Sequence, residues 1–412
     1  MDIITRFENE ISSVLKDFPA NTIFLAAVSG GADSMAMLTA LHSLSQSSIL
    51  HSKFSVLHCE HGLRSEEESL GDGEFVRAFC KERTIACRIR HVPPGKIAAY
   101  AKQKGIGVEA AARFFRHKAF RAEALRICER TDGADVCILT AHTKNDLLET
   151  TLMRILRGCG PAGLAGMKTK SKEQRTKSKE QSEERKAKHC VIVRPLIDLS
   201  RDDVIAYLKA KGISWREDST NADNLFLRNR IRNRLVPLLD EAFTSWRSGI
   251  DAMAETQSLA AQFIADEARR RIVWKEETAD RCLKDQVGSN TKNSQNSLTV
   301  HCSLFSVLCL STDEKNFFAQ PPIVREEAVF QAVDTLIKNM KNPRSVKRAV
   351  VRRFCAAKLP ALLATELPAL SEGDSSVKTA DFGVVLARRD GDKIYITRKR
   401  KEFFERGVSV LI

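Results

Sequence analysis

The chain has 412 residues, more than one ordinary domain needs, so two or three domains are expected. Hydrophobic residues make up 43% of it, and neither a signal peptide nor a run of 18 apolar residues appears, which argues against a membrane span and predicts a cytoplasmic protein. With 66 Lys and Arg against 52 Asp and Glu, the net charge of +14 favours a polyanionic partner such as nucleic acid, although a basic protein without such a partner stays an alternative.

The alternation of elements in the first half predicts the fold class. Strand-like apolar runs occupy 22–28, 53–58, 85–90, 136–141 and 191–193. Between the first four runs, and after the fourth, helical spacing occupies 35–44, 66–81, 107–129 and 145–156. This order predicts an α/β fold with a doubly wound parallel sheet, covered by helices on both faces. In such sheets ligands bind beyond the carboxyl ends of the strands.

A glycine-rich turn follows the first expected strand. The sequence Ser29–Ser34, S-G-G-A-D-S, connects the apolar run Asn21–Val28 to a helical pattern. Its two glycines let backbone N–H groups close on an anion at a helix N-terminus, and Ser29 and Ser34 add hydroxyl donors. Asp33 can hold the Mg²⁺ that accompanies a nucleotide. The turn predicts a phosphate site, with an ordinary glycine-containing turn as the alternative.

The type of phosphate site follows from a motif that is missing and one that is present. No G-x-x-x-x-G-K-[ST] occurs in the chain, which excludes a Walker A loop. The turn instead resembles the pyrophosphate loop, S-G-G-x-D-S, of the ATP pyrophosphatase (PP-loop) superfamily. That resemblance implies cleavage of ATP between the α and β phosphates and adenylation of a carbonyl-type oxygen.

The second expected strand ends in the sequence H-C-E-H-G-L-R. His58 and His61 are spaced like metal ligands, but no third ligand lies nearby, which argues against zinc. They are predicted to contact phosphate, with Arg64 supplying a fixed charge, and structural imidazoles are the alternative. The eleven cysteines contain no C-x-x-C pair, so neither a zinc knuckle nor a simple Fe–S set is indicated, and reduced thiols are expected.

Charged residues recur at helical spacing further along. Arg113 and Arg116 lie at i and i+3 on one face, which suits phosphate oxygens, and a solvated basic face is the alternative. Asp146 and Glu149 have the same spacing after His142, which predicts a negative pocket for an ammonium group or a second metal, against a capped helix start.

The remaining chain is divided by composition. Residues 168–189 are almost wholly polar, so a disordered insertion is expected, with a basic arm on RNA as the alternative. Four arginines crowd 228–234, predicting a surface that follows phosphates, or else a generic solvated face. A helix over 201–211, a largely helical region over 243–365 and a hairpin over 382–398 are expected. The domains are therefore drawn at 1–240, 241–370 and 371–412.

Seven sequence blocks in this order resemble the tRNA(Ile)-lysidine synthase family. The first is the glycine turn at 29–34 and the last is R-N-R-I-R-N-R-L-V-P-L-L at 228–239, with the others at 58–64, 109–116, 141–150, 157–167 and 217–221. The resemblance covers about 22–239, and the rest of the chain matches mainly in length and helical character. Thr143 stands where a second histidine is frequent and Asn145 where aspartate is common.

This resemblance implies an adenine nucleotide alpha hydrolase-like sheet, a helical tRNA-recognition domain and a small β-containing C-terminal domain. It also implies a ligase that attaches L-lysine to C2 of the wobble cytidine of isoleucine tRNA with a CAU anticodon. The cytidine O2 is adenylated by ATP, and the lysine amine then displaces AMP. A homodimer is left open.

The resemblance also implies roles for individual residues. Catalysis is assigned to Asp33, Arg113, His142 and Asp146, and Mg²⁺ to Asp33. ATP contacts are assigned to Ser29, Gly30, Gly31, Ala32, Asp33, Ser34, His58, His61 and Arg64. Lysine or tRNA contacts are assigned to Arg116, Glu149, Arg194, Arg228, Arg230, Arg232 and Arg234.

Three other functions compete with this one. A tRNA cytidine thiolase with the same loop typically carries C-x-x-C pairs, which this chain lacks. An amidating synthetase would need an ammonia source, and no glutaminase signature is evident. An RNA-binding protein without catalysis would keep the positive charge but has no need of Asp33 or Asp146.

Overall fold

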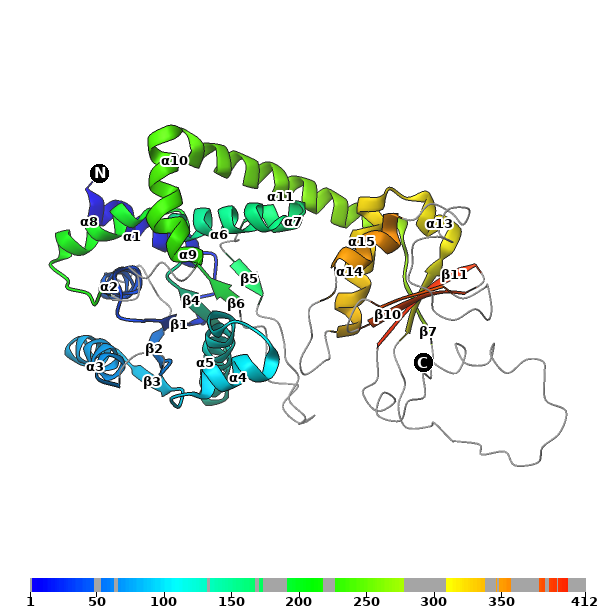
Figure 1. Ribbon diagram of the computed structural model, residues 1–412. Coiled ribbons are helices and arrows are strands. Elements are labelled where there is room, and N and C mark those ends of the chain that lie inside the picture. The colour runs from blue at the N-terminus through cyan, green and yellow to red at the C-terminus, as the bar shows by residue number, and fades with distance from the viewer. Residues whose placement is uncertain are drawn as a thin grey trace, which may run out of the picture. The chain divides into compact units, whose positions relative to one another are not determined.

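The computed structural model describes residues 2–47, 53–62, 66–131, 134–166, 170–172, 191–217, 227–277, 309–337, 346, 348–356, 378–381, 385–390 and 392–398 (Figure 1). The chain divides into two compact units. Unit 1 holds 1–173 and 180–258, and unit 2 holds 174–179 and 259–412. Within the described ranges, no helix combines the length and the apolar character needed to cross a bilayer.

Unit 1 is built on a six-stranded sheet of order β3-β2-β1-β4-β6-β5. The strands are β1 (Ile23–Ala27), β2 (Phe54–Glu60), β3 (Cys87–His91), β4 (Val136–Thr140), β6 (Val191–Val193) and β5 (Lys170–Lys172). All pairings are parallel except that of β5, which runs antiparallel to β6 at the edge. The strand order reverses between β1 and β4, and this switch point is where such sheets bind ligands.

Helices cover both faces of this sheet because alternate residues of its strands point to opposite sides. Phe24 and Ala26 of β1 join a core with side chains of α1 (Ile3–Leu15), α2 (Ala32–Gln46), α3 (Glu66–Glu82) and α8 (Arg201–Lys211). Leu25, between them, joins a second core with Phe120 of α5 (Val108–Arg130). The predicted doubly wound α/β fold is confirmed.

The remaining helices of unit 1 follow the sheet strands or close the unit. They are α4 (Lys96–Lys104), α6 (Lys144–Arg157), α7 (Pro161–Leu164), α9 (Leu227–Arg230), a π-helical turn η2 (Ile231–Leu235), α10 (Val236–Ala242) and the first part of α11 (Trp246–Arg271). Helices α1 and α4 were not expected. Asp2 caps α1 by accepting a hydrogen bond from the Thr5 amide at 2.8 Å, and Phe7 of that helix stacks on Tyr207 at 4.2 Å.

Within the segment 168–189, expected to be a disordered insertion, three residues form a strand. Residues Lys170–Lys172 form β5, whose backbone pairs with β6 in the register Lys170↔Val193 to Lys172↔Val191. Ladder hydrogen bonds to a neighbouring strand can order a stretch that has no apolar face of its own. Residues 168–169 and 173–189 lie outside the described residues.

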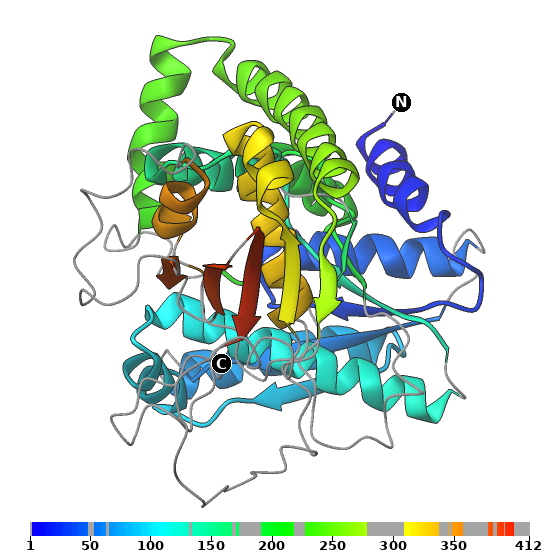
Figure 2. The same ribbon diagram turned by 90° about the vertical axis from the view of Figure 1, so that its right-hand side faces the viewer.

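Unit 2 combines an antiparallel sheet with helices around one core (Figure 2). Its strands, in spatial order, are β7 (Lys275–Glu277), β8 (Cys309–Asp313), β11 (Lys393–Arg398), β10 (Val385–Asp390) and β9 (Lys378–Asp381). Its helices include α13 (Glu314–Ala319), α14 (Pro322–Ile337) and α15 (Arg348–Ala356). Phe317, Val329 and Leu336 of these helices pack with Ile394 and Ile396 of β11.

Unit 2 corrects two expected domain boundaries. The predicted division at 370 separates β8 from β11, but these strands pair from Cys309↔Thr397 to Asp313↔Lys393 and share one core. Strands β9, β10 and β11 therefore belong with the preceding helices. The division near 240 lies at 258 instead, because α10 and the start of α11 belong to unit 1.

Candidate active site at the carboxyl edge of the sheet

The glycine turn after β1 is shaped by its own hydroxyl groups. Ser34 Oγ donates to the Gly31 carbonyl at 2.9 Å and accepts from the Ser29 amide at 3.1 Å. Gly31 is the N-cap of α2, and no side chain caps that helix. The first amide groups of α2 are thus left to bind something else, as at anion sites on helix N-termini.

Gly30 gives the turn its shape and is held from outside. Its φ of +93° is a conformation that L-residues with a side chain rarely adopt. Its carbonyl accepts a 3.0 Å hydrogen bond from the Arg216 amide, while Arg216 Nε donates to Asp72 Oδ1 of α3, also at 3.0 Å. Arg216 therefore links the turn to α3, and sequence reasoning did not single it out.

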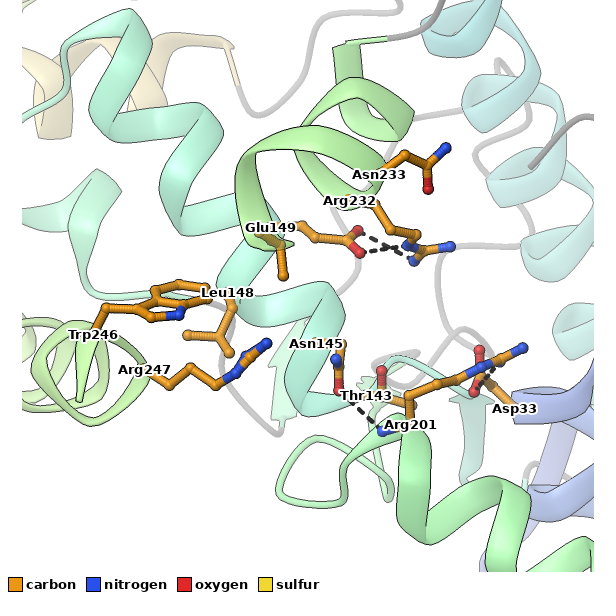
Figure 3. Close-up of a pocket in the computed structure, with 11 residues that line it drawn as sticks. Asp33, Thr143, Asn145, Leu148, Glu149, Arg201, Arg232, Asn233, Trp246 and Arg247 are labelled. Atoms are coloured by element: carbon orange, nitrogen blue, oxygen red, sulfur yellow. Dashed lines mark hydrogen bonds and ion pairs between the residues drawn. The ribbon is translucent and has the colours of Figure 1, made fainter. Parts of the chain in front are cut away.

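Asp33 lies in the first turn of α2 and pairs with an unexpected arginine. Arg201 Nη1 lies 2.6 Å from Asp33 Oδ1, and Figure 3 shows the two side chains facing each other. Burial raises the pKa of Asp33, and the Arg201 charge opposes that shift. Arg201 is the first residue of α8, where the sequence offered only a capping signal at Ser200.

The two histidines at the end of β2, His58 within the strand and His61 just after it, have different surroundings. His58 is buried, and its Nδ1 lies 2.8 Å from the Val28 carbonyl, so this nitrogen carries the proton and donates. Burial lowers the pKa of His58, which makes it a neutral support for the strand end that precedes the turn. His61 Nε2 accepts from Arg116 Nε of α5 at 3.3 Å. Arg64 lies outside the described residues.

Asp146 and Glu149 form a carboxylate pair at the start of α6. Asp146 Oδ2 accepts from the Thr143 amide at 2.9 Å, so the capped helix start is present. Its other oxygen accepts from Arg228 Nη2 at 2.5 Å. Glu149 is buried and accepts from Arg228 Nε at 2.7 Å and from Arg232 Nε at 2.6 Å. The pair therefore binds guanidinium groups in this structure, and Figure 3 shows the contact between Glu149 and Arg232.

The arginine cluster over 228–234 divides into two sets. Burial disfavours the charge of Arg228, but Asp146 and Glu149 outweigh that effect and raise its pKa. Arg228 and Arg232 are thus engaged inside unit 1. Arg230 and Arg234 are exposed, and no ion pair joins either to another residue in the described part of the chain.

His142 lies at the end of β4 among these charges. Its Nδ1 is 3.0 Å from Thr140 Oγ1. Burial, together with the charges of Arg194, Arg228 and Arg113, lowers its pKa to about 4 against the pull of Asp146. The imidazole is therefore neutral near pH 7. Arg194, which follows β6, is buried, and Arg113 on α5 is exposed.

A cavity of about 390 Å³ is lined by Asp33 and Glu149, whereas Asp146, His142 and Arg113 are not among its lining residues. Asp33, Arg201 and Thr143 lie at one end, and Leu148, Trp246 and Arg247 lie at the other (Figure 3). Its remaining lining residues are Asn145, Glu149, Arg232, Asn233 and Val236. Asp240 holds the far wall in place, because it accepts from Trp246 Nε1 at 2.8 Å and from Arg247 Nη2 at 2.7 Å. Nothing in the sequence around Trp246 signalled a role in the site.

The residues of the turn fit a nucleotide and its magnesium. Uncapped amides, two hydroxyls and a glycine at positive φ suit phosphate oxygens. Asp33 provides one carboxylate, and Mg²⁺ is commonly held by one or two carboxylates plus substrate phosphates. Among the described residues no group of three or more His, Cys, Asp or Glu could hold a metal ion by itself.

Comparisons with known proteins identify related sequences. The tRNA(Ile)-lysidine synthase of Treponema denticola is 37% identical over 262 residues, which are 63% of this chain and 51% of that protein. The enzyme of the same name from Treponema pallidum (strain Nichols) is 39% identical over 233 residues, 55% of this chain and 42% of that protein. The chain spans about half the length of the curated relatives it matches.

One solved structure and one family profile complete the comparison. The U34-tRNA thiolase NcsA from Methanococcus maripaludis aligns with a TM-score of 0.44 at 16% identity, over 61% of this chain and 80% of that one. The profile of the PP-loop domain matches residues 3–239, more than half of the chain. Sheet order, the uncapped glycine turn and this match together establish that the chain belongs to the PP-loop domain family.

Proposed function

We propose that this protein is an ATP-dependent ligase that attaches L-lysine to C2 of the wobble cytidine of isoleucine tRNA with a CAU anticodon, forming lysidine in the cytoplasm. Two kinds of observation support the proposal. The curated relatives described above carry the name tRNA(Ile)-lysidine synthase. The observation that carries it is the juxtaposition, in one cavity, of Asp33 from the glycine turn and the carboxylate Glu149.

The nucleotide end of the cavity would perform adenylation. Amides at the start of α2 and the Ser29 and Ser34 hydroxyls would hold phosphate oxygens, and Asp33 would hold Mg²⁺, which supplies charge neutralisation between the phosphates. The cytidine O2 then bonds to the α-phosphorus while the bond to pyrophosphate breaks. AMP thereby becomes a good leaving group at C2.

The carboxylate end of the cavity would receive lysine. The ammonium group of lysine is chemically close to the guanidinium groups that Asp146 and Glu149 already bind, so it must compete with Arg228 or Arg232. Before attack on C2 the amine must lose a proton, and a carboxylate of this pair is positioned to accept it. The C2–N bond forms as the C2–O bond to AMP breaks.

The positive charge of the protein fits a tRNA substrate. The net charge is +14, and Arg230, Arg234 and Arg113 are exposed on unit 1. Such arginines would pair with phosphates of the anticodon stem and loop.

Incorporation of radiolabelled lysine into the CAU-anticodon isoleucine tRNA tests the proposal. We expect incorporation that requires ATP and releases one AMP for each lysine. Asp33→Asn should abolish AMP release in a folded protein. Incorporation without ATP, or transfer of sulfur in place of lysine, would show that the protein is a different PP-loop enzyme.

A further inference from the structure

The ion pair between Asp33 and Arg201 places a cation on the carboxylate that the proposed reaction needs. The two side chains meet at 2.6 Å, and 29% of the Asp33 side chain and 45% of that of Arg201 are exposed. Asp33 is the only acidic residue of the glycine turn. No second ion pair of the Arg201 guanidinium occurs within the described ranges, so Asp33 alone fixes where this charge lies.

The backbone of Arg201 is fixed more firmly than its side chain. Its amide donates to Asn145 Oδ1 at 2.9 Å, and the Lys144 amide donates to the Leu199 carbonyl at 2.9 Å. The preceding Ser200 caps α8 through a reciprocal pair of bonds with Asp203. The start of α8 is thereby tied to the start of α6, while the long arginine side chain can change partners without moving either helix.

Charge repulsion keeps Asp33 from serving two cations through one oxygen. Mg²⁺ binds carboxylate oxygen at about 2.0–2.1 Å, and a divalent cation on the oxygen that pairs with Arg201 would repel the guanidinium from it. A guanidinium released from Asp33 would remain beside the turn, where phosphate oxygens bind. Arginine is suited to this exchange because its fork of N–H groups matches both carboxylate and phosphate oxygens.

We propose that Arg201 is a positioning residue of the nucleotide site: it occupies Asp33 before nucleotide binds, and passes to phosphate oxygens of the nucleotide when Mg·ATP takes Asp33. The proposal rests on the proposed ATP-dependent function but not on the identity of the second substrate. In this proposal Arg201 competes with a free divalent cation for Asp33 but contributes to the binding of the nucleotide. Removing the side chain should therefore move these two affinities in opposite directions.

Two binding measurements on the full chain separate these effects. Binding of Mn²⁺ to the nucleotide-free protein is followed by electron paramagnetic resonance. Binding of magnesium α,β-methylene-ATP, which cannot be cleaved at the reacting bond, is followed by calorimetry. For Arg201→Ala we expect Mn²⁺ to bind roughly threefold tighter, because a positive charge that competes for Asp33 is lost. The nucleotide should bind roughly tenfold weaker, because a charge-assisted hydrogen bond to its phosphates is lost.

Matched variants guard against a general loss of structure. Lys211→Ala removes an ion pair with Glu8, at 2.8 Å, from the other end of α8, and both affinities should stay within twofold of wild type. Arg201→Gln keeps a polar, hydrogen-bonding side chain without the positive charge and should show the same opposite shifts, also where Arg201→Ala folds poorly. Arg201→Lys should recover most of the nucleotide affinity.

The outcomes distinguish this inference from the proposed function. If Arg201→Gln weakens the binding of both ligands, or changes neither affinity, the exchange is overturned and the ion pair of Arg201 with Asp33 has only a structural role. A wild-type protein that binds no nucleotide would overturn it too. If the opposite shifts are seen but no lysine enters tRNA, the exchange stands and the ligase assignment fails.

Discussion

At the scale of single residues, the backbone conformation of Gly30 is the most restrictive feature of the site. A Cβ there would meet Val76 Cγ2 at 3.6 Å and Arg216 Cγ at 3.8 Å, which are ordinary contacts, so the positive φ and not crowding excludes other residues. We expect Gly30→Ala to destabilise unit 1 by about 1–2 kcal/mol in urea unfolding and to abolish nucleotide binding.

The neighbouring glycine supplies the control for this prediction. Gly31 has a φ of −74°, and a Cβ at that position would lie 3.6 Å from Ser29 Oγ. Gly31→Ala should therefore unfold at nearly the wild-type urea concentration. Equal destabilisation by both substitutions would mean that φ at Gly30 is not the limiting factor.

His142 makes folding sensitive to pH. Its pKa of about 4 in the folded protein lies below the value near 6.5 of an exposed histidine, so the unfolded chain binds one more proton between these values. Stability due to His142 is thus complete above about pH 6.5 and is lost as the pH falls toward 4, by up to about 3 kcal/mol. Unfolding of wild type and of His142→Gln, compared across this interval, should differ in slope, and parallel curves would contradict the burial of a neutral imidazole.

At the scale of secondary-structure elements, two carboxylates of α6 pair with two guanidinium groups, one from α9 and one from the π-helical turn η2. Glu149 is buried at 4% side-chain exposure, whereas Arg232 is 42% exposed, which lowers the strength of their pairing. We expect a double-mutant cycle of Glu149→Ala and Arg232→Ala to give a coupling energy of about 1–3 kcal/mol in urea unfolding.

An exposed pair of the same chemistry provides the reference for that cycle. Asp266 and Arg269 on α11 pair at i and i+3 with both side chains 57% exposed. Their cycle should give less than about 0.5 kcal/mol. If the Glu149–Arg232 coupling energy is no larger than this, a substrate ammonium can displace Arg232 from Glu149 with no loss of folding free energy.

Much of unit 1 could be predicted from sequence because its signals are local. Hydrophobic periodicity places strands β1 to β4 to within two residues, and the glycine turn lies where the strand-to-helix transition requires it. The carboxylates Asp146 and Glu149 were found from spacing on one helix. Their arginine partners were identified as a cluster, but pairing across about 80 residues of chain depends on tertiary packing.

Other parts of the site could not be predicted for the same reason. Arg201 and Arg216 act through contacts with Asp33 and with the Gly30 carbonyl, and no spacing rule connects such distant positions. In unit 2, the pairing of β8 with β11 joins residues about 80 positions apart. Composition placed a domain boundary between these strands because it registers local polarity and not strand pairing.

At the scale of the whole molecule, the position of the unit boundary has a testable effect. Trp246 and Arg247, which form one wall of the cavity, lie beyond residue 240 but within unit 1, as does Asp251, which pairs with Lys144 at 2.8 Å. A fragment ending at Ser258 should bind α,β-methylene-ATP within threefold of the full chain. Its affinity for tRNA, by filter binding, should fall at least tenfold if unit 2 supplies RNA contacts.

A shorter fragment provides the comparison. A chain that ends at Leu239 lacks Trp246 and Arg247 of the cavity wall and Asp251, the ion-pair partner of Lys144. We therefore expect calorimetry to show weaker binding of nucleotide and of lysine than in the longer fragment. Equal binding by the two fragments would place the functional boundary near 240. Unchanged tRNA affinity in both would remove unit 2 from substrate recognition.

The π-helical turn η2 carries one residue more than a regular turn at the point where the chain leaves the carboxylates. Deleting a residue there would restore a regular helical turn and shift the side chains between Arg228 and Val236 relative to Glu149 and the cavity. The number of residues between Arg228 and Trp246 is thus set by backbone geometry. Among related sequences, replacements in this stretch should therefore greatly outnumber changes in its length.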